Sequence, residues 1–136
     1  MAAGEEEVML ILRSEVDVLR ARKEGQRLAQ EIGMNRIDSV KVATAVSEIA
    51  SNALFHGQQA TIRLCVVQEG KRSGLSVIVA DKGPGIPDLG AALRDGYSTR
   101  KSLGIGLGAA KRMMDDFEIC TGIDKGTTVT MTKWKE

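Results

Sequence analysis

The hydrophobic and polar positions along the chain predict short strands and amphipathic helices in a defined order. Runs that are apolar or alternate between apolar and polar residues are typical of strands, and they occupy residues 8–12, 60–67, 75–80, 118–122 and 127–134. Apolar residues at helical spacing occupy residues 15–32, 38–55 and 108–116. The predicted order is therefore β-α-α-β-β-loop-α-β-β, with a long loop over residues 81–102 that is typical of a functional segment.

Two of the predicted helices carry a row of apolar residues that is expected to face the core. In the first helix this row is Val16, Leu19, Leu28 and Ile32. In the second helix it is Val42, Val46, Ile49 and Ala53, and Asp38 or Ser39 can cap that helix. Because helices and strands do not alternate strictly, a doubly wound parallel sheet is disfavoured. We predict a single domain over residues 1–136 with a two-layer α/β sandwich (α+β) fold, in which a mixed, mostly antiparallel sheet carries helices on one face.

Composition and charge narrow the range of functions. A net charge of +1 and an aromatic content of 3% argue against nucleic-acid binding through phosphate neutralisation or base stacking. No apolar run approaches the ~20 residues that span a membrane, and the acidic N-terminus is no secretory signal. Cys65 and Cys120 are expected to be buried thiols on strands, without the four ligands that a zinc site needs. We expect a cytoplasmic protein without a nucleic-acid or membrane partner.

Glu48 and Asn52 form a first candidate pair of site residues. They are four residues apart on the second predicted helix and share a face, opposite the apolar row of that helix. Asparagine offers a neutral oxygen to Mg²⁺, which takes few protein ligands and keeps water and phosphate oxygens. A glutamate can orient or deprotonate an attacking group. Taken alone, the pair is more typical of a solvated helix face.

Asp81 directly follows a predicted strand and begins the sequence Asp-Lys-Gly-Pro-Gly. An ionised aspartate is a pure acceptor, so it can receive a hydrogen bond from the exocyclic amine of adenine. Gly83 and Gly85 allow the backbone to come close to such a base and to adopt positive φ. The same residues are also typical of a plain turn.

Three glycines, Gly104, Gly106 and Gly108, are expected to open the last helix. Glycines before a helix N-terminus expose backbone N–H groups to an anion, and the helix dipole adds to the attraction. A dinucleotide-binding motif is disfavoured because no strand immediately precedes them, and a P-loop because no Gly-Lys-Ser/Thr follows. Together with Glu48 and Asn52 and with the Asp81 motif, the three glycines predict an ATP site. Such a site has one part that binds the base, one that binds a metal ion and one that binds the phosphates.

These motifs resemble the signature of the GHKL ATPase superfamily, which includes gyrase, histidine kinases, heat-shock chaperones and mismatch-repair proteins. The three motifs of that signature correspond to Glu48–Asn52, Asp81–Gly85 and Gly104–Gly108. Four segments further resemble bacterial anti-sigma regulatory kinases of the RsbT type, which are the switch kinases of the stressosome. These segments are Ala43–Glu48, Asp81–Asp88, Asp95–Thr99 and Gly126–Thr130. The resemblance covers nearly the whole chain and implies the Bergerat fold.

The resemblance also implies an activity, cofactors and partners. It implies a protein serine/threonine kinase that uses ATP and Mg²⁺, phosphorylates small STAS-domain antagonist proteins, and then binds and activates a metal-dependent protein phosphatase. Glu48 would be the general base, Asn52 the magnesium ligand and Asp81 the adenine acceptor. The nucleotide would further contact Gly83, Gly85, Ser98, Thr99, Gly104, Gly106, Gly108 and Thr127. The resemblance assigns no role to Arg100 and Lys101, which by their charge alone would make the loop that covers the site more positive.

A second interpretation is an anti-sigma factor or similar regulatory binding module that holds a sigma factor and keeps ATP as a structural ligand. The fold is common to both functions and therefore cannot decide between them. Glu48 favours the enzyme, because a pure binding module has no need of a general base. His56, the only histidine, is interpreted as a structural or site-rim residue rather than a phosphoacceptor.

Overall fold

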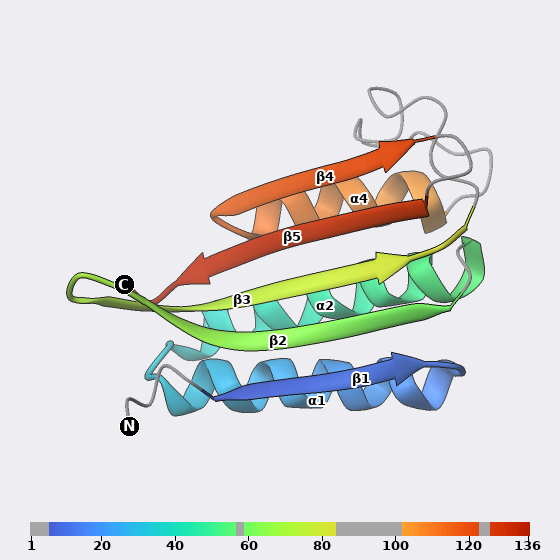
Figure 1. Cartoon of the computed structure of the whole chain (residues 1–136). Helices are drawn as coiled ribbons and strands as arrows, with labels where there is room; N and C mark the ends of the chain where they lie inside the picture. Colours follow the sequence, from blue (N-terminus) through green and yellow to red (C-terminus); the bar gives the residue numbers. More distant parts are fainter. Residues whose placement is uncertain (1–5, 57–58, 84–101, 123–125) are drawn as a thin grey trace.

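A computed structural model of the chain describes residues 6–56, 59–83, 102–122 and 126–136. The elements within these residues are β1 (Glu7–Leu12), α1 (Glu15–Glu31), α2 (Arg36–His56), β2 (Ala60–Glu69), β3 (Arg72–Asp81), α4 (Ser102–Met113), β4 (Asp116–Gly122) and β5 (Gly126–Trp134) (Figure 1). Their order is the predicted one.

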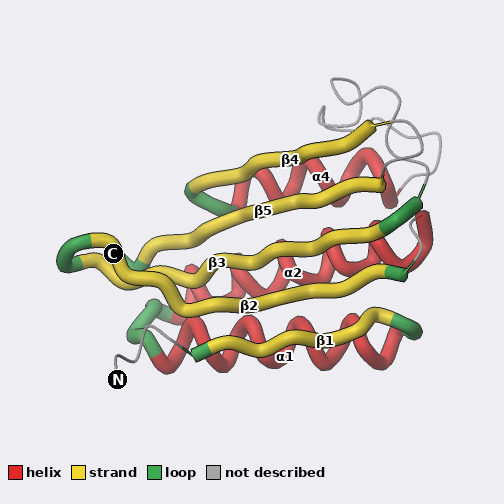
Figure 2. Tube along the Cα trace, viewed as in Figure 1, coloured by secondary structure: helices red, strands yellow, loops and turns green. Residues whose placement is uncertain are grey.

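The five described strands form one sheet in the order β1-β2-β3-β5-β4. All four pairings are antiparallel, so no parallel pair occurs among the described strands. The three described helices lie together on one face of the sheet (Figure 2). The predicted two-layer sandwich is therefore confirmed, and its core lies between the helices and the inward-facing residues of β2, β3 and β5.

Helix α2 packs its predicted apolar row into this core. Its buried apolar residues include Val42, Val46, Ile49 and Ala53. The predicted cap is wrong: the side-chain Oδ1 of Asn35 accepts the backbone N–H of Asp38 at 2.8 Å, so the helix begins earlier, at Arg36. Ser39 is instead fully buried and donates its hydroxyl to the carbonyl of Arg36 at 3.0 Å.

Helix α1 buries only the second half of its predicted row, Leu28 fully and Ile32 in part. Val16 and Leu19 are 59% and 57% exposed, whereas the buried residues are Val18, Ala21, Gly25, Leu28 and Ala29. Most of these are small, which lets the helix approach its neighbours closely. A β-carbon on Gly25 would lie 3.2 Å from Val46 Cγ2 and 3.4 Å from Leu64 Cδ2.

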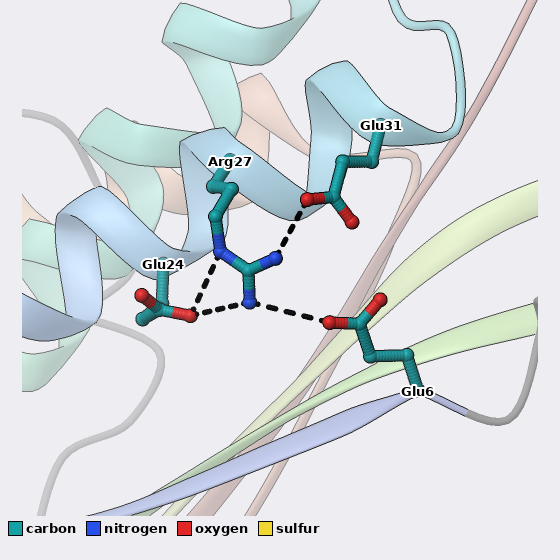
Figure 3. A network of polar contacts seen from close by, with 4 residues as sticks. All are labelled: Glu6, Glu24, Arg27 and Glu31. Carbon is teal, nitrogen blue, oxygen red and sulfur yellow. Dashed lines mark hydrogen bonds and ion pairs between the residues drawn. The ribbon is translucent and has the colours of Figure 1, made fainter.

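Arg27 joins the second half of α1 to the start of β1 through three carboxylates (Figure 3). Its guanidinium lies 2.6 Å from Glu24, 2.7 Å from Glu31 and 3.3 Å from Glu6. Hydrogen bonds to Glu24 and Glu31 raise the pKa of Arg27 above its ordinary value. All four side chains are partly exposed, so the network is accessible to solvent and salt.

The opposite end of the β3–β5 pair from Asp81 is held by polar contacts around Trp134. The Trp134 backbone N–H donates to Asp115 at 2.7 Å, and its indole N–H donates to Asp116 at 3.1 Å. The guanidinium of Arg72 stacks on the indole, 3.9 Å from the ring centroid. The adjacent Lys133 is buried, with its ammonium 3.5 Å from Asp115 and 3.9 Å from Asp38 of α2.

The expected burial of the two cysteines and the expected lack of a membrane-spanning segment can be compared with the fold. Cys65 and Cys120 are free thiols on strands, but Cys65 is half-buried and Cys120 is exposed, so the prediction of two buried thiols is wrong. In their registers both lie on the sheet face away from the helices, because they alternate with core residues such as Leu64 and Val129. Among the described helices, none combines the length and apolar character needed to cross a membrane.

Candidate functional site

The predicted site residues come from four elements whose ends meet at one end of the molecule. Strand β3 ends at Asp81, β5 begins at Gly126, α4 begins at Ser102 and α2 ends at His56. Figure 1 shows these four ends on the same side, on the right. Helix α4 also packs against α2, so the motifs predicted from separate parts of the chain are brought to one region.

The carboxylate of Asp81 lies at the end of β3, partly removed from water. Its Oδ1 accepts the backbone N–H of Gly83 at 2.8 Å, which closes a short turn after the strand. Desolvation by burial raises the pKa of Asp81, and backbone hydrogen bonds from Gly83 and Thr127 oppose that rise. Asp81 is therefore a fixed acceptor in a poorly solvated position, as recognition of a neutral donor requires.

Gly126 brings the start of β5 against the backbone of Asp81. Its φ is +79°, in the left-handed region that favours glycine. A β-carbon there would lie 2.1 Å from the carbonyl oxygen of Asp81 and 3.0 Å from Lys82 Cα. Only glycine fits this contact, which places the next residue, Thr127, opposite Asp81 in the β3–β5 register.

Asn52 is buried in α2 with its polar group unpaired. It is only 6% exposed, and among the described residues neither its Oδ1 nor its Nδ2 finds a hydrogen-bond partner. Leaving a buried polar group unsatisfied costs roughly 1–3 kcal/mol, so the arrangement is suited to a ligand that supplies the missing bonds. The prediction that Asn52 lies on the face of α2 opposite the apolar row is wrong, because its side chain is buried. Glu48, one turn earlier, is half-buried.

Helix α4 begins earlier than the glycine motif predicted. It starts at Ser102, so Gly104, Gly106 and Gly108 lie within the helix rather than before it. It also ends at Met113, because the Asp115 backbone N–H bonds to the Thr132 carbonyl at 2.9 Å and directs the chain into β4. Glycine costs a helix about 1 kcal/mol relative to alanine, and burial of Leu107 and Ala110 offsets that cost.

Part of the predicted site lies outside the described residues. Gly85, Ser98, Thr99, Arg100 and Lys101 all fall there, and their predicted contacts with the nucleotide stay predictions. Within the described part, Thr121 of β4 is a residue that sequence reasoning missed. Its Oγ1 lies 2.9 Å from Oγ1 of Thr127. Only the alternation of side chains along the two strands, once paired, could have pointed to it.

Comparison with known proteins gives the class to which this arrangement belongs. Residues 12–133 match the family described as "Histidine kinase-like ATPase domain". The chain is 36% identical over 123 residues to the serine/threonine-protein kinase RsbT of Bacillus subtilis, across 90% of this chain and 92% of that protein. It is 32% identical over 99 residues to an anti-sigma F factor of Thermoanaerobacter, across 68% of each.

A solved structure supports the same fold. It contains the RsbU and RsbW domains of a Mycobacterium tuberculosis protein, and it aligns with a TM-score of 0.65 at 19% identity over 96% of this chain and 33% of that one. The matches confirm the predicted resemblance and the predicted class of enzyme, an ATP-dependent protein serine/threonine kinase. The chain belongs to the histidine kinase-like ATPase domain family, among its partner-switching kinases and anti-sigma factors.

Proposed function

We propose that the chain transfers the γ-phosphate of ATP to a serine or threonine of a STAS-domain antagonist protein, and that it then binds and activates a metal-dependent protein phosphatase. The observation that carries the proposal is Asn52, which is buried in the helix that also holds Glu48 and whose two polar atoms have no partner among the described residues. The similarity to the kinase RsbT over nine tenths of the chain supports transfer to a protein hydroxyl.

Asp81 would recognise the adenine base of ATP. Its carboxylate accepts the backbone N–H of Gly83 at 2.8 Å and would accept a hydrogen bond from the adenine amine. Gly83 is buried and has no side chain to obstruct the base. Guanine carries a carbonyl oxygen in place of that amine and would face the carboxylate with an acceptor, so the same group would select against it.

The phosphates would lie between α2 and the start of α4. The first backbone N–H groups of a helix lack partners within it and carry partial positive charge, and Gly104 falls in that part of α4. Asn52 fits a magnesium nucleotide, since its unpaired Oδ1 is the type of oxygen that Mg²⁺ accepts. Bound Mg²⁺ would neutralise charge on the phosphate oxygens.

The transfer step needs little covalent chemistry from the protein. The hydroxyl oxygen of the partner's serine or threonine attacks the γ-phosphorus, and the bond from that phosphorus to the β,γ-bridging oxygen breaks. ADP leaves with the electron pair of the broken bond. Glu48 accepts the hydroxyl proton or orients the hydroxyl for attack.

A regulatory binding module is the second candidate. The similarity to anti-sigma F factors favours it, because the same fold would then hold a sigma factor with ATP as a structural ligand. The two functions differ in one observable: the module would bind ATP without transferring phosphate to a STAS-domain protein.

The deciding experiment follows phosphate from γ-labelled ATP, with Mg²⁺, to a purified STAS-domain protein encoded in the same genome. We expect label on the STAS-domain protein, and we expect Glu48→Gln to bind ATP normally while transfer falls by about 10²- to 10⁴-fold. Glu118→Gln, an exposed glutamate of β4, is the matched control and should transfer at the wild-type rate. ATP binding without label on any STAS-domain protein would favour the binding module, and full activity of Glu48→Gln would remove Glu48 from the mechanism.

A further inference from the structure

Three polar side chains continue the rows of the apolar core toward the candidate site. Val79 of β3 pairs with Val129 of β5, which pairs with Ile119 of β4. Two residues further along the same strands, Asp81 pairs with Thr127, which pairs with Thr121. Side chains two apart on a strand share a face, so Asp81, Thr127 and Thr121 form a polar row on the helix-facing side.

This row is linked by hydrogen bonds from β4 to the carboxylate. Burial raises the pKa of Asp81, and backbone hydrogen bonds from Gly83 and Thr127 oppose that rise. The side-chain Oγ1 of Thr127 lies 2.9 Å from Oγ1 of Thr121. Thr121 also donates to the carbonyl of Gly126 at 3.3 Å, and Gly126 is the residue whose backbone packs on Asp81. Thr121 therefore contacts two of the residues that lie against Asp81, Gly126 and Thr127.

We propose that Thr121 is a positioning residue for nucleobase recognition, which acts by fixing the hydroxyl of Thr127 beside Asp81. A threonine hydroxyl has a single proton and otherwise rotates freely about its C–O bond. The hydrogen bond to Thr121 fixes the rotation of the Thr127 hydroxyl. It therefore fixes the direction in which that hydroxyl can bond to a ligand. The inference rests on the proposed function, since it requires that a nucleotide base lies against Asp81 and Thr127.

Asp81 and Thr127 would then act together on the base. Asp81 presents an acceptor to the amine of adenine, and a fixed Thr127 hydroxyl presents a second polar group of defined direction next to it. If Thr121 is replaced by an apolar residue of similar shape, Thr127 is free to rotate and can adapt to another base. Loss of the hydroxyl of Thr121 should therefore weaken ATP binding and also reduce the preference for ATP over GTP.

The test measures dissociation constants of ATP and GTP, with Mg²⁺, for the wild type and three variants by calorimetry. We expect Thr121→Val to weaken ATP binding by about 3- to 10-fold, the effect of one neutral hydrogen bond, and to weaken GTP binding less. Thr121→Ser restores the hydroxyl and should restore both constants to within about 2-fold. Thr130→Val makes the same change on β5, but its side chain lies on the opposite face of the sheet, so it should leave both constants unchanged.

The outcomes separate this inference from the proposed function. If the wild type binds no ATP, the proposed function fails and this inference fails with it. If the wild type binds ATP but Thr121→Val retains its affinity and its preference over GTP, the inference is overturned while the proposed function stands. An equal loss in Thr121→Val and Thr121→Ser, with thermal unfolding showing both folded, would also overturn it, because the effect would then not depend on the hydroxyl.

Discussion

The two ends of the β3–β5 pair use their polar groups in opposite ways. At the Trp134 end, the ammonium of Lys133 lies between Asp38 and Asp115, and both N–H groups of Trp134 donate to carboxylates. At the Asp81 end, a carboxylate is desolvated and the buried amide of Asn52 has no partner among the described residues. The first arrangement joins strands and helices to one another, whereas the second leaves hydrogen-bonding capacity for a ligand.

A tightly packed glycine lies at each end and makes the comparison testable. Gly126 packs on the backbone of Asp81, and Gly74 packs on the indole of Trp134 and the carbonyl of Lys133. The same substitution can be made at both positions. If the two ends have separate roles, alanine at Gly126 should strongly weaken ATP binding, and alanine at Gly74 should affect stability alone.

Gly126→Ala should have the largest effect on nucleotide binding. The new β-carbon would lie 2.1 Å from the carbonyl oxygen of Asp81, in a backbone with φ of +79°, so β5 must move away from Asp81. A misplacement of about 1 Å can lower a reaction rate by about 100-fold, and we expect a loss of about that size in ATP affinity by calorimetry. Wild-type affinity in this variant would show that Gly126 and Asp81 are not held together as described.

Gly74→Ala should lower stability without changing affinity. The added carbon would lie 2.6 Å from Trp134 Cε3 and 2.8 Å from the Lys133 carbonyl oxygen, and overpacking of this kind costs about 1–3 kcal/mol. Urea unfolding should show the loss, while the dissociation constant of ATP in the folded protein stays within about 2-fold of wild type. A large drop in affinity would mean that the two ends are coupled through the strands.

Sequence reasoning predicted the element order and the site motifs, but it could not predict contacts that depend on packing. The core row of α2 was visible because Val42, Val46 and Ile49 are large and regularly spaced. The core face of α1 was not, because the pattern gave weight to large apolar residues such as Val16 and Leu19. Close packing against α2 and the sheet instead selected a row of small residues around Gly25.

The site shows the same limit. Asp81 and Asn52 could be found from the sequence because their motifs are local. The start of α4 could not, since the packing of Leu107 and Ala110 supports a helix that includes the glycines. Thr121 could not either, because its role depends on which residue of β5 lies opposite it, and that register exists only once the strands have paired.

Asp81→Asn should separate binding from stability in a pH-dependent way. Burial raises the pKa of Asp81 in the folded state. At a pH between the ordinary and the raised pKa, folding therefore takes up protons. At a pH above the raised pKa, the ionised carboxylate lowers the stability of the fold. The asparagine variant should therefore be at least as stable as wild type near neutral pH, and its advantage should shrink as pH falls from the raised toward the ordinary pKa. It should also bind ATP poorly, because its amide can present a donor to the adenine amine.

The measurement is urea unfolding of both proteins from about pH 7 to about pH 4, without nucleotide. Glu118→Gln, which neutralises an exposed carboxylate, is the control and should show no such trend. If Asp81→Asn is clearly less stable than wild type at neutral pH, the hydrogen bonds to Gly83 and Thr127 outweigh the desolvation of the carboxylate.

Arg27→Gln should have the smallest effect and tests whether the contacts away from the site contribute to binding at all. The variant leaves Glu6, Glu24 and Glu31 close together without their cation (Figure 3). Because these side chains are partly exposed, water and salt screen the repulsion, so the melting temperature should fall slightly at low salt and match wild type at high salt. Arg27→Lys keeps the charge and should fall less. At each salt concentration, the ATP affinity of both variants should equal that of the wild type. If affinity instead changes together with the melting temperature, α1 and β1 help to set the geometry around Asp81.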